Sequence, residues 1–121
     1  MASQKGHLEV ARLLVKARAA IDKAANGGAT PLYMASHKGH LEVARLLVEA
    51  GADIDKARDD GATPLHIASG RGYLEVIKTL LGSGADATLA AEDGMTPFEE
   101  AKRMYHPQVV VSPLEAALRK K

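Results

Sequence analysis

The stretch that decides the fold is GATPL at residues 61–65, which also occurs at residues 28–32 and, in the looser form GMTPF, at residues 94–98. Both steps along the chain are 33 residues. In every copy a threonine precedes a proline, an order typical of a helix start with threonine as the N-cap and proline in the first turn. The sequence therefore predicts that a helix begins at the same place in each 33-residue unit.

A second repeated block keeps the same period. Residues 5–15 and residues 38–48 are both KGHLEVARLLV, and residues 71–81 are RGYLEVIKTLL. The apolar residues of this block recur at helical spacing, so it predicts a second helix. Eleven identical residues at a fixed separation do not arise from composition bias, so the chain is an array of repeats.

Glycines divide each unit into two helices. In the best-defined unit we expect the first helix over residues 64–69, a break at 70–72 and the second helix over 73–82. Gly51 and Gly84 stand where the end of a second helix needs a positive φ. One such unit cannot bury its own apolar faces, so neighbouring units must stack.

This combination of motifs closely resembles the ankyrin repeat. The residues that carry the resemblance in one unit are DGATPLHIA at 60–68, GYLEV at 72–76, LL at 80–81 and GAD at 84–86. Residues 28–90 match over two full repeats, and both ends of the chain match in part. The resemblance implies an all-α fold, a helix-turn-helix solenoid of paired antiparallel helices with projecting hairpin-like loops.

The whole chain is expected to form one domain, because 121 residues suit a single compact domain better than two. We divide residues 1–121 into a partial repeat (1–27), two full repeats (28–60 and 61–93) and a C-terminal capping repeat (94–121).

The N-terminal unit departs from the repeat pattern. Met1 aligns with Met34, late in a first helix, so the chain is expected to begin inside a unit. A start within a longer array and an unusual natural cap both explain this. Arg18 stands where the next unit has Gly51, and residues 15–25 are a run of good helix formers without a breaker.

Two conformations of this segment follow. Either the first long helix continues from His7 towards Ala24 or Ala25, or a loop like that of the neighbouring units tolerates Arg18. A continued helix would expose the first full repeat and favour self-association or segment exchange between chains. The residues expected to mediate self-association are Val10, Leu14, Ala17, Arg18 and Ile21.

The C-terminal unit starts normally at residues 96–98 and then deviates, because Pro113 replaces Leu80 of the preceding unit. Proline cannot lie inside a straight helix without the loss of a hydrogen bond. Residues 112–115, SPLE, instead predict a capping box, so the last helix is expected from about Pro113 to about Arg119, after a turn or irregular link at residues 106–111.

Composition excludes several classes of protein. The net charge is +1, from 16 basic and 15 acidic residues, which argues against a broad phosphate-binding surface, so nucleic acid is not an expected partner. Cysteine is absent, which excludes disulfides and thiolate metal sites. No stretch resembles a signal peptide or a membrane span, so we expect a soluble intracellular protein, cytoplasmic or nuclear, without membrane contact.

For the residues that could take part in catalysis or metal binding, a structural role is favoured over a chemical one. His37 and His40 have a spacing found in metal sites, but no nearby carboxylate completes the set. By the resemblance, His66 hydrogen-bonds locally around Thr63. No serine lies in a nucleophile elbow, and the carboxylates at 99–100 are adjacent on a helix and do not face each other. We expect no catalytic residue, metal or cofactor, and no enzyme activity.

The resemblance implies a partner-binding surface at the loop tips and on the first-helix face of the concave side. The loops of this surface carry mainly acidic residues, and the helix ends carry mainly basic ones. No tryptophan or tyrosine is expected there. Binding hot spots are enriched in Trp, Tyr and Arg, so this surface either uses Arg71 and Arg103 or binds weakly. The candidate residues are Asn26, His37, Lys38, Asp59, Asp60, Arg71, Glu92, Asp93, Met95, Arg103 and Met104.

The sequence thus favours a non-catalytic protein-interaction scaffold whose partner is another protein. The alternatives are a self-associating, dimeric or segment-exchanged repeat module and a designed or consensus-derived scaffold. The eleven-residue identity is consistent with design and equally with recent duplication.

Overall fold

The computed structural model describes residues 22–104, 113–114 and 116–117. Over residues 22–104 it contains five α-helices, one 3-10 turn and no strand, so the all-helical prediction is confirmed. The elements are η1 (Asn26–Gly28), α2 (Pro31–Lys38), α3 (Leu41–Glu49), α4 (Pro64–Arg71), α5 (Leu74–Gly82) and α6 (Pro97–Arg103). Within this part of the chain every helix is too short or too polar to cross a bilayer.

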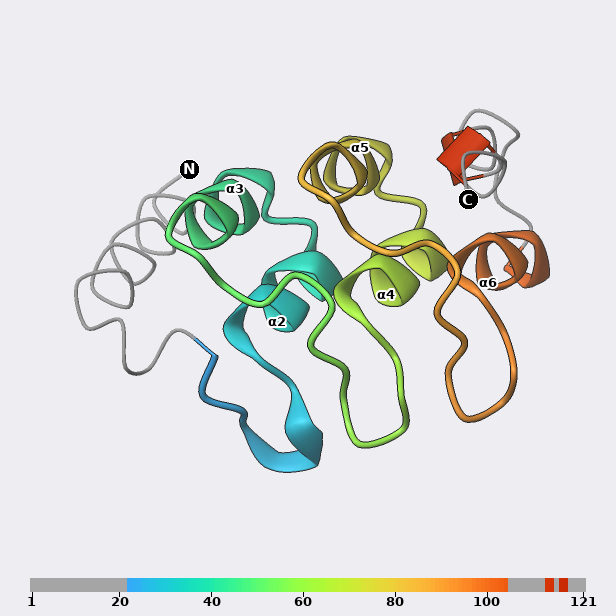
Figure 1. Ribbon diagram of the computed structural model, residues 1–121, viewed down its shortest axis with the longest axis horizontal. Helices are drawn as coiled ribbons and strands as arrows, with labels where there is room; N and C mark the ends of the chain where they lie inside the picture. Colours follow the sequence, from blue (N-terminus) through green and yellow to red (C-terminus); the bar gives the residue numbers. More distant parts are fainter. Residues whose placement is uncertain (1–21, 105–112, 115, 118–121) are drawn as a thin grey trace.

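The helices form two rows, with loops projecting from one side (Figure 1). Helices α2, α4 and α6 make one row, α3 and α5 lie behind it, and the loops extend away from α3 and α5. Each first helix packs against the next, α2 on α4 and α4 on α6, and α2 and α4 also pack against their own second helices, α3 and α5. The arrangement is the stacked helix-turn-helix solenoid that the repeat predicts.

The three threonines predicted as N-caps begin the first helices. The side chains of Thr30, Thr63 and Thr96 accept hydrogen bonds from amides three residues later, at 3.2, 3.2 and 3.3 Å. Proline occupies the first turn in each case. The predicted end of the first helix at Ser69 is two residues short, because α4 continues through Arg71. The chain leaves the helix only at Gly72, whose φ is 76°.

The core lies between the two rows and is aliphatic. Leu32 and Leu65 of the first helices and Leu47, Ile77 and Leu80 of the second helices are fully buried. Alanines at one repeat position let the first helices approach each other closely, since none is more than 4% exposed; they are Ala35, Ala68 and Ala101. Substitution of these alanines by larger residues would separate the first helices.

Backbone hydrogen bonds join the tip of each loop to the next. The Asp59 amide donates to the Gly27 carbonyl at 2.9 Å, and the Glu92 amide donates to the Asp60 carbonyl at 2.9 Å. Because both bonds connect equivalent positions of neighbouring units, the loops form a continuous ladder along one side of the solenoid.

Carboxylates make a second set of links near the ends of the second helices. The Asp53 amide donates to the Asp22 carboxylate at 3.0 Å, and 33 residues later the Asp86 amide donates to the Asp55 carboxylate at 3.0 Å. The segment before α2 therefore contacts the next unit in the same way as the loop between α3 and α4 does.

Of the two conformations expected for this segment, the loop is found at residues 22–25, and the continuation of the first long helix to residue 24 or 25 is wrong. Residues 22–25 are not helical, and Ala25 is extended, with φ −82° and ψ −174°. Helix propensity is a weak preference that tertiary contacts override, and here the Asp22 link to the next unit requires a loop. The earlier part of the predicted helix, including Arg18, lies outside the described residues.

The histidine of the second full unit connects α4 to the following loop. The Thr63 amide donates to His66 Nδ1 at 3.1 Å, so that nitrogen is an acceptor and Nε2 carries the proton. His66 Nε2 therefore donates to the Met95 carbonyl at 2.8 Å, and the side chain is only 3% exposed. The structural role expected for His66 is confirmed, and it extends to the next unit.

The predicted restart of a helix at Pro113 is consistent with the described C-terminal residues. Pro113, Leu114, Ala116 and Ala117 are helical, and Leu114 is fully buried. Ser112, the predicted link at 106–111 and the predicted end at Arg119 lie outside the described residues.

We predict that His66→Phe lowers the free energy of unfolding by about 2–3 kcal/mol, because it leaves the buried groups at both ends of the imidazole without partners. Urea denaturation measures this change. Lys78→Gln, on an exposed face of α5, is the control and should shift the value by less than about 0.5 kcal/mol. An equal effect of the two substitutions would contradict the connecting role of His66.

Candidate functional site

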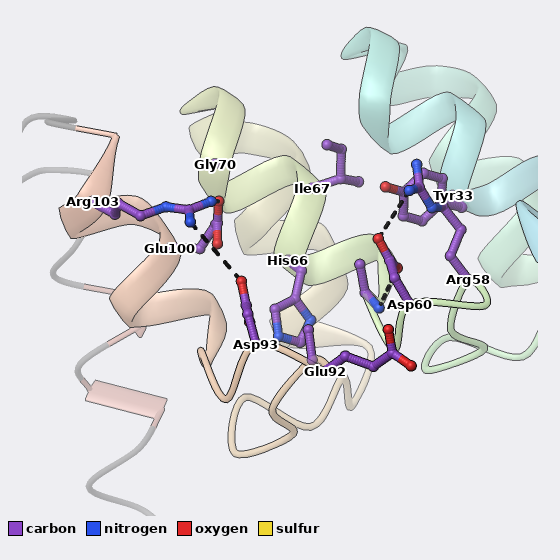
Figure 2. A pocket seen from close by; sticks show the side chains of 12 residues that line it. Tyr33, Arg58, Asp60, His66, Ile67, Gly70, Glu92, Asp93, Glu100 and Arg103 are labelled. Atoms are coloured by element: carbon purple, nitrogen blue, oxygen red, sulfur yellow. Dashed lines mark hydrogen bonds and ion pairs between the residues drawn. The ribbon is translucent and has the colours of Figure 1, made fainter. Parts of the chain in front are cut away.

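A pocket of about 390 Å³ lies between the loops and the row of first helices (Figure 2). It draws on α2, α4 and α6 and on the two loops that precede α4 and α6. Its lining residues come from both the helix row and the loop ladder: Tyr33, Arg58, Asp60, Ala62, His66, Ile67, Gly70, Ala91, Glu92, Asp93, Glu100 and Arg103.

One end of the pocket is a stacked group of three side chains. The Arg58 guanidinium lies 5.3 Å from the centroid of the Tyr33 ring and donates to the Asp60 carboxylate at 2.9 Å. The other carboxylate oxygen of Asp60 accepts from the Ala62 amide at 3.0 Å, which fixes the loop. Burial raises the pKa of Tyr33, while the nearby Arg58 opposes that rise. This end is held in place by contacts between a helix and a loop.

The other end is a guanidinium held by two carboxylates. Arg103 Nη2 donates to Glu100 at 2.5 Å, and Arg103 Nη1 lies 4.0 Å from Asp93. Figure 2 shows Glu100 next to the arginine head group and Asp93 below them. The Glu100 side chain is only 18% exposed, and its Cγ lies 3.2 Å from where a Cβ on Gly70 would be. The absence of a side chain at Gly70 therefore leaves space for Glu100 at this end.

The middle of the pocket has an apolar floor and an acidic rim. His66 and Ile67 of α4 face it, and Figure 2 shows the Glu92 side chain below Asp60. Within the described residues the Glu92 carboxylate has no ion-pair partner, and the residue is exposed. The pocket lining thus carries four carboxylates against two guanidinium groups.

Charged and polar side chains make up most of the pocket lining. The lining contains no serine, threonine or lysine that could act as a nucleophile. Among the residues that the structure describes, no group of three or more histidines and carboxylates is placed to hold a metal ion. What the pocket offers is charge, hydrogen-bond acceptors and a small apolar surface.

His37 and Arg71 meet beside the pocket, across neighbouring units. Arg71 donates to His37 Nε2 at 2.8 Å, so the ring proton is on Nδ1. Nδ1 is buried and has no hydrogen-bond partner among the described residues. Burial lowers the pKa of His37, and the positive charges of Arg71, Lys38 and Arg58 lower it further. The neutral ring is therefore the form that this arrangement favours.

The structure brings together four of the residues that the sequence singled out. Asp60, Glu92, Asp93 and Arg103 line one pocket. The others lie on the same side of the molecule but outside the lining: Asn26 in η1, His37 and Lys38 at the end of α2, Asp59 and Met95 in the loops, Arg71 at the end of α4, and Met104 after α6. Their role in partner binding remains a prediction.

Sequence reasoning missed several pocket residues, above all Tyr33, Arg58 and Glu100. The expectation that no tyrosine lies on this surface is wrong, because Tyr33, although buried, forms part of the pocket wall. Arg58 stands two residues before Asp60, a charge pair that was visible in the sequence. Glu100 occupies the repeat position of Ile67, and a comparison of residues 33 apart would have placed both on the same face.

The residues expected to mediate self-association are not tested by the structure. Val10, Leu14, Ala17, Arg18 and Ile21 all lie outside the described residues.

Comparison with known proteins bears on the first two thirds of the chain. The sequence profile of a family described as ankyrin repeats (many copies) matches residues 1–48 and residues 32–81. No curated protein matches the chain. The family match spans 81 of the 121 residues, and it agrees with the resemblance inferred from the repeated motifs.

We predict that His37→Gln makes stability less dependent on pH between 7.5 and 5.5. The pKa of His37 is lowered from 6.5 in the folded chain, so the unfolded chain binds this proton more readily. The free energy of unfolding should therefore fall as the pH decreases through 6.5, and the fall should be smaller without the imidazole. Gln keeps an acceptor for Arg71. Urea denaturation of both chains at the two pH values measures the difference, and identical pH dependence would contradict the shift.

Proposed function

The chain belongs to the ankyrin repeat family, and on that premise we propose that it is a non-catalytic scaffold that binds a protein partner through its loop tips and concave helix face. Ankyrin repeats are generally protein–protein interaction modules. The single observation that carries the proposal for this chain is the pocket shared by three successive first helices and two loops.

The pocket supports this proposal because its walls are fixed before any partner arrives. His66 and the ladder of loop amides hold the loops against α4 and α6. A preformed surface loses less conformational entropy on binding than a mobile one does. The volume of about 390 Å³ lies within the range of roughly 300–1,000 Å³ typical of ligand pockets, so it can take one or a few side chains of a larger partner.

The domain division belongs to the same proposal. We take residues 1–121 as one domain with units at 1–27, 28–60, 61–93 and 94–121, because the cap at Thr96 and the buried Leu114 continue the stack. The eleven candidate contact residues lie along one side of that stack, and four of them line the pocket.

Self-association is the weaker alternative. It requires the first long helix to continue and expose the first full unit, and the loop at residues 22–25 removes part of that support. No described residue favours a homodimer over a complex with another protein.

Selection of a displayed library of random dodecapeptides on the immobilised chain tests the proposed function. Selected peptides should lose about tenfold in affinity with Arg71→Ala and with Asp60→Ala, because charged groups at a binding surface are common hot spots. Asp60→Asn is a second variant that keeps an oxygen for the Ala62 amide and so separates loop distortion from loss of charge.

Arg45→Ala is the matched control, since Arg45 is an exposed, ion-paired arginine on α3, behind the first-helix row. It should leave the affinity unchanged. Failure to select any peptide, or equal loss with the Arg45 variant and the Arg71 variant, would overturn the proposed function.

A further inference from the structure

The pocket already binds guanidinium groups of its own chain. Arg58 is held by Asp60 at 2.9 Å against the ring of Tyr33. Arg103 is held at the other end by two carboxylates through two different nitrogens. The lining is therefore suited by its geometry to planar cations that donate several hydrogen bonds.

The carboxylates of the pocket exceed its cations. Asp60 neutralises Arg58, and Arg103 faces two carboxylates, which leaves one negative charge at that end. Glu92, an exposed residue of the same lining, has no ion-pair partner in the described part of the chain. A cation that enters the middle of the pocket would thus meet two uncompensated negative charges.

Gly70 creates part of the space at the Arg103 end. Its equivalents in the neighbouring units are His37 and Arg103, both of which carry long side chains. A Cβ at Gly70 would lie 3.2 Å from Glu100 Cγ. The middle unit therefore lacks a side chain at the position where its neighbours have one, and Glu100 lies against the gap.

We propose that this pocket receives an arginine side chain from the bound segment of a partner protein, an inference that rests on the proposed function. The guanidinium lies beside the Glu92 carboxylate, in a pocket that Asp93 and Glu100 also line. The aliphatic part of the side chain lies over the apolar floor at Ile67 and Ala91.

The probe for this inference is N-acetyl-arginine methylamide, with the neutral N-acetyl-citrulline methylamide as its shape-matched control. Amide chemical shifts of the full chain, recorded at pH 7 and constant ionic strength, follow each titration. The arginine probe should shift the amides of Gly70 and of residues 91–94 and saturate, and the citrulline probe should not at the same concentrations.

Three variants sharpen this test. Glu92→Gln should lower the affinity for the arginine probe about threefold, as expected for the loss of a partly exposed charge pair. Glu75→Gln on α5 should leave that affinity unchanged. Arg103→Gln should raise the affinity for the arginine probe about threefold, because the carboxylates of Glu100 and Asp93 lose their own cation.

Several results would overturn the inference. Equal binding of the citrulline probe, no effect of Glu92→Gln, or weaker binding by Arg103→Gln would each do so. So would shifts of the same amides by N-acetyl-glutamate methylamide, since these would mean that Arg71 or Arg103 recognises an acidic partner.

The inference and the proposed function fail in different ways. Library peptides that lack arginine but depend on Asp60 and Arg71 would overturn the arginine site and leave the interaction scaffold intact. The absence of any selected peptide would overturn the scaffold itself.

Discussion

The structure depends on the stacking of units that cannot bury their apolar faces alone. Leu32 and Leu65 are fully buried, and small alanines let the first helices lie close together. The same stacking aligns the loops, so that the Glu92 amide reaches the Asp60 carbonyl and His66 reaches Met95. The pocket is a consequence of this alignment, because its lining residues come from three successive units, 28–60, 61–93 and 94–121.

Binding by such a surface depends on which charges the stack leaves uncompensated. Arginine is common at binding surfaces, but Arg58 and Arg103 are already paired with carboxylates of the pocket. Arg71 differs, because its recorded partner is the neutral imidazole of His37. The concave side therefore has an acidic pocket between α4 and α6 and a basic edge at Lys38 and Arg71. This asymmetry would orient an extended partner segment.

The sequence predicted the fold where the determinants are local and repeated. The threonine caps, the glycines that end helices and the family follow from motifs 33 residues apart. It could not choose between a loop and a continued helix at residues 22–25, where the contact between Asp22 and Asp53 accompanies a loop. Only four of the twelve residues that line the pocket were predicted, because the contacts of Tyr33 with Arg58 and of Arg103 with Asp93 join helices to loops in a way that the repeat pattern does not encode.

The central claim is that stacking holds the loops in place before a partner binds. Amide hydrogen exchange at Glu92 tests it most directly, since this amide lies in a loop and its bond partner is in the neighbouring unit. The account predicts that the Glu92 amide exchanges as slowly as the buried amides of α4, through unfolding of the stack. Exchange of Glu92 at the rate of an open chain, while α4 remains protected, would contradict it.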